Sequence, residues 1–152
     1  MLSLVVFSCA KKNVEKHDDS FPWQTIEIST AHQKITIYSD LDTASYQNAI
    51  YKRVSKQAFM GSYKLEKIEK SNFKINKNER DSIYSFVFKT ITKPHSSNLR
   101  CTDYVGNVSI KLMTSSTSLS CNYYSVCDWS KVSPETKKIY DFLKSKVKLS
   151  SN

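Results

Sequence analysis

The sequence predicts an α+β domain. Two hairpins and one or more additional strands form a small antiparallel sheet, and two amphipathic helices pack on one face of it. Two pairs of segments alternate between apolar and polar residues, as the strands of antiparallel hairpins do. Two other segments carry apolar residues at helical spacing behind capping residues. The hairpins are separated from the helices along the chain, which favours an α+β arrangement over alternating β-α-β units.

The first hairpin is predicted at residues 25–29 and 33–39, where apolar and polar residues alternate on both sides of a short connection. The isoleucines expected on its core face are Ile26, Ile28, Ile35 and Ile37.

The next two segments differ in how clearly their pattern predicts secondary structure. Residues 44–59 are ambiguous, because apolar residues recur there at helical spacing while residues 51–56 also suit a strand. Residues 63–69 alternate again and predict a strand that continues toward Phe73, with Tyr63 and Leu65 on one face.

A helix is predicted at about residues 77–92. Asn76 occupies the N-cap position, and Glu79 stands three residues later, which is the spacing of a capping box. Pro94 closes the segment. Its apolar face is expected to consist of Ile83, Phe86, Val87 and Ile91.

A second hairpin and a last helix follow. Residues 107–113 and 118–124 alternate, and their core face is expected to carry Val108, Ile110 and Leu112. Ser133 then caps a helix over about residues 134–147, with Pro134 in its first turn. Its buried stripe is expected to consist of Ile139, Phe142, Leu143 and Val147.

The first nine residues carry a different signal. An apolar run ends in Val6-Phe7-Ser8-Cys9, where a small residue precedes a cysteine. This stretch resembles the signal peptide of bacterial lipoproteins, in which the cysteine receives a lipid and becomes the new N-terminus. The resemblance implies a lipidated Cys9 and a membrane-anchored location in the cell envelope. Because no Lys or Arg precedes Cys9, we expect translation to start upstream of Met1. The alternative is a buried strand with a core cysteine.

The organisation expected along the chain follows from this resemblance. Residues 1–8 are the remnant of the signal peptide, and residues 9–20 are the lipidated cysteine with a flexible tether. The tether holds one large apolar residue in eleven, too few to bury surface and fold. Residues 21–149 are expected to form a single α+β domain, a usual length for one core.

The cysteines suggest one disulfide in an oxidising compartment. The turn of the second hairpin lies near residues 115–116, so Cys101 and Cys127 fall near its open end on opposite arms. We therefore expect a Cys101–Cys127 disulfide, with Cys121 as a small core residue. Zinc is the competing interpretation, but no CxxC pair or adjacent histidine supports it.

The net charge of +9 invites a nucleic-acid interpretation, which the residue types disfavour. Only three of the 23 basic residues are arginine, and the lysines are scattered rather than interleaved with aromatic residues. We expect no nucleic-acid partner; attraction to anionic lipid or an acidic protein fits better.

The sequence contains no recognisable catalytic motif and predicts no metal or cofactor. Its histidines lie at positions 17, 32 and 95, in segments expected to be loops or tether. We expect a non-catalytic, protein-binding module of inhibitor, immunity or assembly type; the alternative is a small envelope hydrolase whose site the sequence does not reveal. Trp129 is either a core plug or, with Tyr123 and Tyr124, part of a binding surface.

Overall fold

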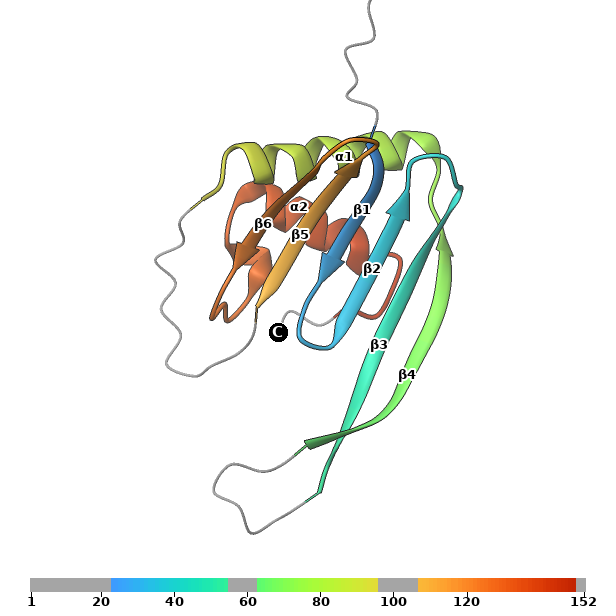
Figure 1. The fold of residues 1–152 in the computed structure, drawn as a ribbon, viewed down its shortest axis with the longest axis vertical. Coiled ribbons are helices and arrows are strands. Elements are labelled where there is room, and N and C mark those ends of the chain that lie inside the picture. Colours follow the sequence, from blue (N-terminus) through green and yellow to red (C-terminus); the bar gives the residue numbers. More distant parts are fainter. Residues whose placement is uncertain (1–22, 55–62, 96–106, 150–152) are drawn as a thin grey trace, which may run out of the picture.

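The computed structural model describes residues 23–54, 63–95 and 107–149. Within them, six strands form one antiparallel sheet and two α-helices cover one face, which confirms the predicted α+β fold (Figure 1). The strands are β1 (Trp23–Ser29), β2 (Gln33–Tyr38), β3 (Thr43–Arg53), β4 (Tyr63–Lys74), β5 (Val108–Thr114) and β6 (Ser118–Tyr123). The helices are α1 (Lys77–Thr92), the short 3-10 helix η1 (Trp129–Lys131) and α2 (Pro134–Lys144).

The strand order across the sheet is β4-β3-β2-β1-β5-β6. The first four strands form a meander, each antiparallel to the one before it. Helix α1 then leads the chain back across the sheet, so that β5 pairs with β1 and β6 becomes the opposite edge (Figure 1).

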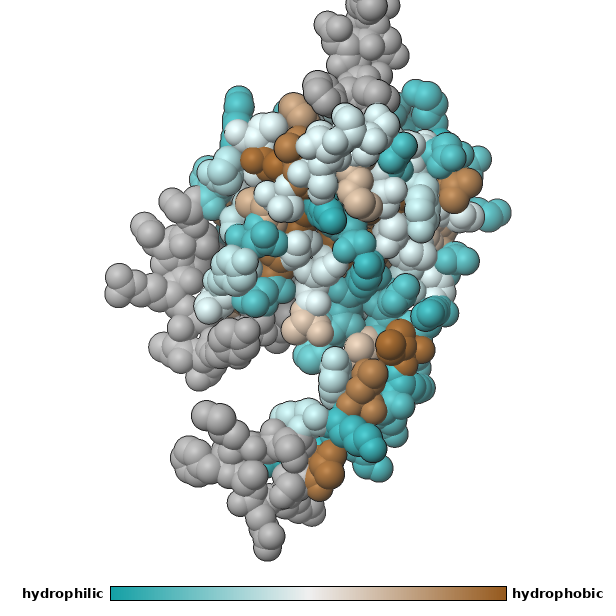
Figure 2. Space-filling model, viewed as in Figure 1, coloured by the Kyte–Doolittle hydropathy of each residue, from teal (hydrophilic) through white to brown (hydrophobic). Residues whose placement is uncertain are grey.

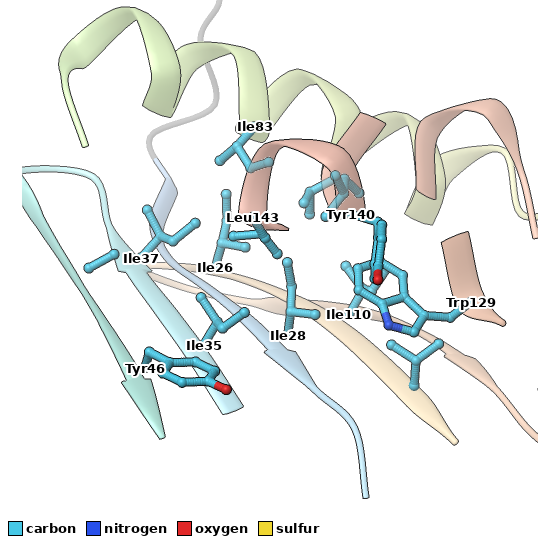
Figure 3. Packing of buried hydrophobic residues seen from close by; sticks show 14 of the residues in the cluster. Ile26, Ile28, Ile35, Ile37, Tyr46, Ile83, Ile110, Trp129, Tyr140 and Leu143 are labelled. Carbon is cyan, nitrogen blue, oxygen red and sulfur yellow. The ribbon is translucent and has the colours of Figure 1, made fainter. Parts of the chain in front are cut away.

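The core lies between the sheet and the two helices. All four isoleucines of the first hairpin and all three apolar residues predicted on β5 are at most 2% exposed. Figure 3 shows strand side chains such as Ile26 and Ile28 pointing toward Ile83 of α1 and Leu143 of α2. Burying each such side chain contributes roughly 1.5–3 kcal/mol, so this layer supplies most of the stability of the fold.

Helix α1 begins where the sequence predicts. The side chain of Asn76 accepts a hydrogen bond from the Glu79 backbone N–H (3.0 Å), and Glu79 Oε2 accepts one from the Asn76 N–H (2.9 Å). This reciprocal capping box satisfies two backbone donors that the helix itself leaves unpaired. Ile83 and Val87 are buried as predicted, whereas Phe86 and Ile91 are half-buried and pack against the edge of the core.

Helix α2 is shorter than predicted. Ser133 caps it and Pro134 begins it, but the last helical residue is Lys144 rather than residue 147. Ile139 and Leu143 are fully buried, while the predicted Phe142 and Val147 are half-buried and pack on the core. Thr136 and Tyr140 are the other buried residues of the helix, and the sequence prediction missed both.

The segment that was ambiguous in sequence, residues 44–59, is a β-strand as far as it is described. Strand β3 pairs with β2 from Ala44 to Asn48 and with β4 along its whole length. Strand β4 extends to Lys74, one residue past the predicted limit. These two strands are eleven and twelve residues long, whereas β1 and β2 have seven and six, so the β3–β4 pair extends beyond the body of the sheet (Figure 1).

Candidate functional site

The aromatic group predicted as a binding surface divides between the core and the surface. Trp129 is 2% exposed, and its ring contacts that of Tyr140 edge-to-face at 5.2 Å between centroids (Figure 3). It therefore fills the core, the first of the two alternatives, and offers no side-chain surface to a partner. Tyr123 is half-buried and Tyr124 is 72% exposed, so Tyr124 alone of the three presents its ring to solvent.

The buried end of Tyr123 has a distinct environment. Its hydroxyl is shielded from solvent and has no hydrogen-bond partner in the described part of the chain. Burial first, and then the neighbouring thiol of Cys121, raise the pKa of the Tyr123 phenol. The raised pKa favours the neutral phenol, and the ring packs against the core.

The cysteine predictions are only partly within the described residues. Cys121 lies on β6 opposite Ile110, half-buried on the core side, and carries a free thiol. Cys127 precedes η1, but Cys101 and Cys9 lie outside the described residues. The Cys101–Cys127 disulfide and the lipidation of Cys9 therefore stay predictions.

The described histidines are far apart along the fold and join no catalytic or metal cluster. His32 lies in the turn between β1 and β2, and His95 follows α1; His17 is outside the described residues. Across residues 23–54, 63–95 and 107–149, no group of three His, Cys, Asp or Glu side chains is placed to hold a metal ion. In the same residues, no helix is long and apolar enough to cross a membrane.

An open cavity of about 670 Å³ lies beside His32, at the foot of the β3–β4 extension. Its described lining consists of His32, Gln33, Asn48, Ala49, Tyr51 and Tyr63. The ring of Tyr51 contacts that of His32 edge-to-face at 5.1 Å between centroids. Among these described lining residues there is no carboxylate, serine or thiol to pair with His32 as the partner of a catalytic histidine.

The feature that sequence reasoning missed is the extension itself, which we call the ribbon: residues 49–54 and 63–68. Strand β2 stops pairing with β3 at Asn48, so beyond that point β3 pairs with β4 alone. Five of the eight large apolar side chains that are exposed in the described residues lie on the ribbon. They are Tyr51, Val54, Tyr63, Leu65 and Ile68.

The strand register gathers four of these side chains on one face. Tyr51 pairs with Leu65, and its neighbours two residues away in β3, Ala49 and Arg53, pair with Ile68 and Tyr63. Paired residues and residues two apart share a face of a sheet. Tyr51, Tyr63, Leu65 and Ile68 therefore form one continuous apolar stripe, with exposed fractions between 41% and 65%.

A β-bulge makes this arrangement possible. The register shifts between Ile50, which pairs with Lys67, and Tyr51, which pairs with Leu65, so Glu66 is an extra residue on β4. Without the shift, Leu65 and Ile68 would face opposite sides because they are three residues apart. The bulge thus places both on the stripe.

The ribbon is also basic. It carries Lys52, Arg53, Lys64 and Lys67 against a single acidic residue, Glu66, for a net charge of +3. On the face away from the stripe, Lys52 pairs with Lys64 across the two strands. Figure 2 shows hydrophobic residues along this hairpin, while the visible face of the sheet body is mostly hydrophilic.

These residues combine two properties that protein-contact surfaces share. A contiguous exposed apolar patch marks an interaction site, and tyrosine is enriched where proteins meet. The basic residues of the ribbon, Arg53 on the stripe face and three lysines on the other face, complement an acidic surface. No protein-family model, curated protein or solved structure matches the chain, so its own residues carry the functional argument.

Proposed function

We propose that this protein is a lipid-anchored component of the bacterial cell envelope that binds another protein, with no catalytic role of its own. The ribbon is its contact surface, and the partner presents an apolar patch rimmed by acidic residues. The anchor part of the proposal depends on the resemblance of Val6-Phe7-Ser8-Cys9 to a lipoprotein signal.

The observation that carries the binding part is the apolar stripe. The outer face of the sheet body is polar: β1 presents Thr25 and Glu27 there, and β5 presents Ser109 and Lys111. On this face, which neither helix covers, the described sheet body exposes one large apolar side chain, Tyr38 opposite Thr25, whereas the ribbon exposes four together. An exposed Tyr-Leu-Ile surface gains free energy when a partner removes it from water, at roughly 25 cal/mol per Å².

The charge of the ribbon selects the partner class. Because the ribbon has a net charge of +3, association with an acidic surface is favoured and association with a basic one is opposed. A binding role of this kind is that of an inhibitor, immunity or assembly protein, which acts by occupying a partner rather than by chemistry.

A photo-crosslinking residue placed at single positions of the full chain, expressed in its native cells, tests the contact surface. Substitution at Leu65 and at Ile68 should each yield the same discrete adduct with a second protein. The matched control is Ser120, which is exposed on β6 and distant from the ribbon. An adduct from Ser120 equal to that from Leu65, or no adduct from either stripe position, would refute the contact surface.

The anchor is tested separately. Cys9→Ala should abolish incorporation of radiolabelled palmitate and move the protein out of the membrane fraction, while Cys121→Ala should change neither. Unchanged palmitate labelling and fractionation of Cys9→Ala would remove the envelope anchor from the proposal and leave the contact surface standing.

A further inference from the structure

Strand β4 is a free edge of the sheet over its whole length. It is the first strand in the order β4-β3-β2-β1-β5-β6, so within the described residues only β3 pairs with it. Ten consecutive residues, 63–72, are exposed, which shows that no described helix or loop covers this strand. About half of its backbone N–H and C=O groups point away from β3, since these groups alternate between the two sides of a strand.

The two faces of β4 differ in chemistry. Tyr63, Leu65 and Ile68 lie on the stripe face, because their partners on β3 are Arg53, Tyr51 and Ala49. Lys64 and Lys67 lie on the opposite face, because their partners are Lys52 and Ile50. The lysine face also carries Glu69, which forms an ion pair with Lys67 (2.6 Å). A strand placed beside residues 63–68 of β4 therefore meets apolar side chains on one face and the ammonium groups of Lys64 and Lys67 on the other.

We propose that β4 pairs with an extended segment of the partner protein, in which apolar residues alternate with Asp or Glu. This inference deepens the proposed function and rests on it. Backbone hydrogen bonds to the free edge supply the pairing, as in other cases of strand addition. The apolar residues of the added strand extend the stripe beside Leu65 and Ile68, and its carboxylates lie beside Lys64 and Lys67.

Charge argues against a second copy of this chain as the occupant. Strand β4 carries Lys64, Lys67, Lys70 and Lys74 against Glu66 and Glu69. Two copies of β4 paired edge to edge would bring lysines near lysines, and like charges on neighbouring strands are destabilising. Lysine on an edge strand is a common protection against self-association, and the same lysines admit an acidic strand.

The backbone argues against a lipid bilayer as the occupant. Insertion of the stripe into hydrocarbon would carry the unpaired N–H and C=O groups of the β4 edge with it. Each such group costs several kcal/mol in lipid when it has no hydrogen-bond partner. An added strand satisfies these groups, whereas lipid tails do not.

The test uses two synthetic peptides of about ten residues, a length within the usual range of strands. In one peptide valine alternates with glutamate, and in the other valine alternates with lysine. The Val/Glu peptide should slow amide hydrogen exchange at alternate residues of β4, those whose N–H points away from β3, as measured by NMR on the full chain. The Val/Lys peptide should leave these amides unchanged.

Charge reversal sharpens the test. Lys64→Glu/Lys67→Glu should weaken binding of the Val/Glu peptide by about tenfold or more and allow the Val/Lys peptide to bind. The matched control, Lys70→Glu/Lys74→Glu, makes the same change in net charge on the other face of β4, since Lys70 pairs with Gln47 and Lys74 with Thr43. It should change affinity by less than about threefold.

Three outcomes would overturn the inference. The first is peptide binding without protection of β4 amides, and the second is equal binding of the two peptides. The third is no binding of the Val/Glu peptide; dimerisation of the chain or binding to vesicles of phosphatidylglycerol would then identify the occupant of the edge instead. None of these outcomes changes the crosslinks expected from Leu65 and Ile68. Failure of strand addition can therefore be told apart from failure of the proposed function.

Discussion

Tyr51 and Leu65 stand directly opposite each other on β3 and β4, and their side chains are 41% and 44% exposed. In the body of the sheet, paired apolar residues such as Ile28 and Ile35 are covered by the helices and almost fully buried. Ile28 and Ile35 lie on the face that the helices cover, whereas Tyr51 and Leu65 lie on the opposite face, so the same kind of pair forms core on one face and an open apolar surface on the other. This difference is the physical basis of the proposed contact surface.

The stripe should contribute little to folding. We expect Leu65→Ser to change the free energy of unfolding by less than about 0.5 kcal/mol, because the side chain is 44% exposed and no described element packs over it. Ile110→Ala, at a fully buried position of β5, should cost about 2 to 5 kcal/mol. Urea denaturation of the two variants checks both values. A loss from Leu65→Ser as large as that from Ile110→Ala would mean that the stripe is structural.

Arg80 should be one of the most important polar residues for stability. Its side chain is 10% exposed, and Nη1 donates to the carbonyls of Leu41 (2.8 Å) and Ile75 (3.1 Å) and to Asp42 Oδ1 (2.6 Å). It thereby ties the β2–β3 turn to the start of α1. We expect Arg80→Met to cost about 2 to 3 kcal/mol, because two carbonyls lose a donor.

The partner carboxylate provides the control for Arg80. The side chain of Asp42 is 85% exposed, so Asp42→Asn should cost less than about 1 kcal/mol. Equal losses from the two variants in urea denaturation would show that the ion pair, rather than the carbonyl contacts, gives Arg80 its effect.

Glu79 gives the fold a defined dependence on pH. A hydrogen bond from Lys146 (2.7 Å), then one from the Asn76 N–H, lowers the pKa of Glu79 below its ordinary value of 4.5. A carboxyl whose pKa is lower in the folded state stabilises the fold fully above its unfolded pKa, and this contribution is lost as the pH falls through the folded pKa.

The Glu79→Gln substitution isolates this effect, because glutamine preserves the capping-box hydrogen bond while removing the charge. The variant should be less stable than the natural protein at pH 7. The difference should shrink as the pH falls below 4.5 and vanish once the pH lies below the lowered pKa of Glu79. Thermal unfolding across this range measures the difference, and a gap independent of pH would contradict the assignment.

The residues after α2 are held to the sheet by Tyr46. Its hydroxyl donates to the carbonyl oxygen of Lys148 (2.7 Å) and accepts from Gln33 Nε2 (2.8 Å). We expect Tyr46→Phe to cost about 1 to 2 kcal/mol and to speed amide exchange in residues 145–149 before the rest of the fold. Unaltered exchange in that segment would show that packing of Val147 and Leu149 is sufficient to hold it.

Local signals predicted much of the fold from sequence. The alternation of Ile26, Ile28, Ile35 and Ile37 identified the first hairpin and its buried face, and these residues are the core of the sheet. The capping residues Asn76 and Ser133 located the starts of both helices. Such features are predictable because each depends on neighbours within a few residues.

Long-range pairing explains what the sequence left open. Residues 44–53 have apolar residues at helical spacing, and pairing with β2 and β4 decides that they form a strand. The position of β5 beside β1 depends on contacts between residues some 80 positions apart, such as Ile28 and Ile110. The segment after α2 is likewise held by long-range hydrogen bonds, from Tyr46 and Gln33 to the carbonyl of Lys148.

The candidate site was the least predictable part. Tyr63 and Leu65 were correctly expected on one face, but the pattern alone does not say whether helices cover that face. Trp129 shows the opposite outcome. It was a candidate for the binding surface, because it lies between a strand and a helix, and it is buried in the core. A predicted strand that is longer than the strands it pairs with is the sequence signal for such an extension. Here β3 and β4 are longer than β1 and β2.

The most direct test of the stripe as a contact surface compares Leu65→Ser with Leu41→Ser. The two leucines are 44% and 45% exposed, and Leu41 lies in the turn at the other end of β3. The measured quantity is the yield of the photo-crosslinked adduct formed from Ile68 in each background. Leu65→Ser should lower this yield by about tenfold or more, as loss of a central contact does, and Leu41→Ser should leave it unchanged. Equal yields in the two backgrounds would contradict the account.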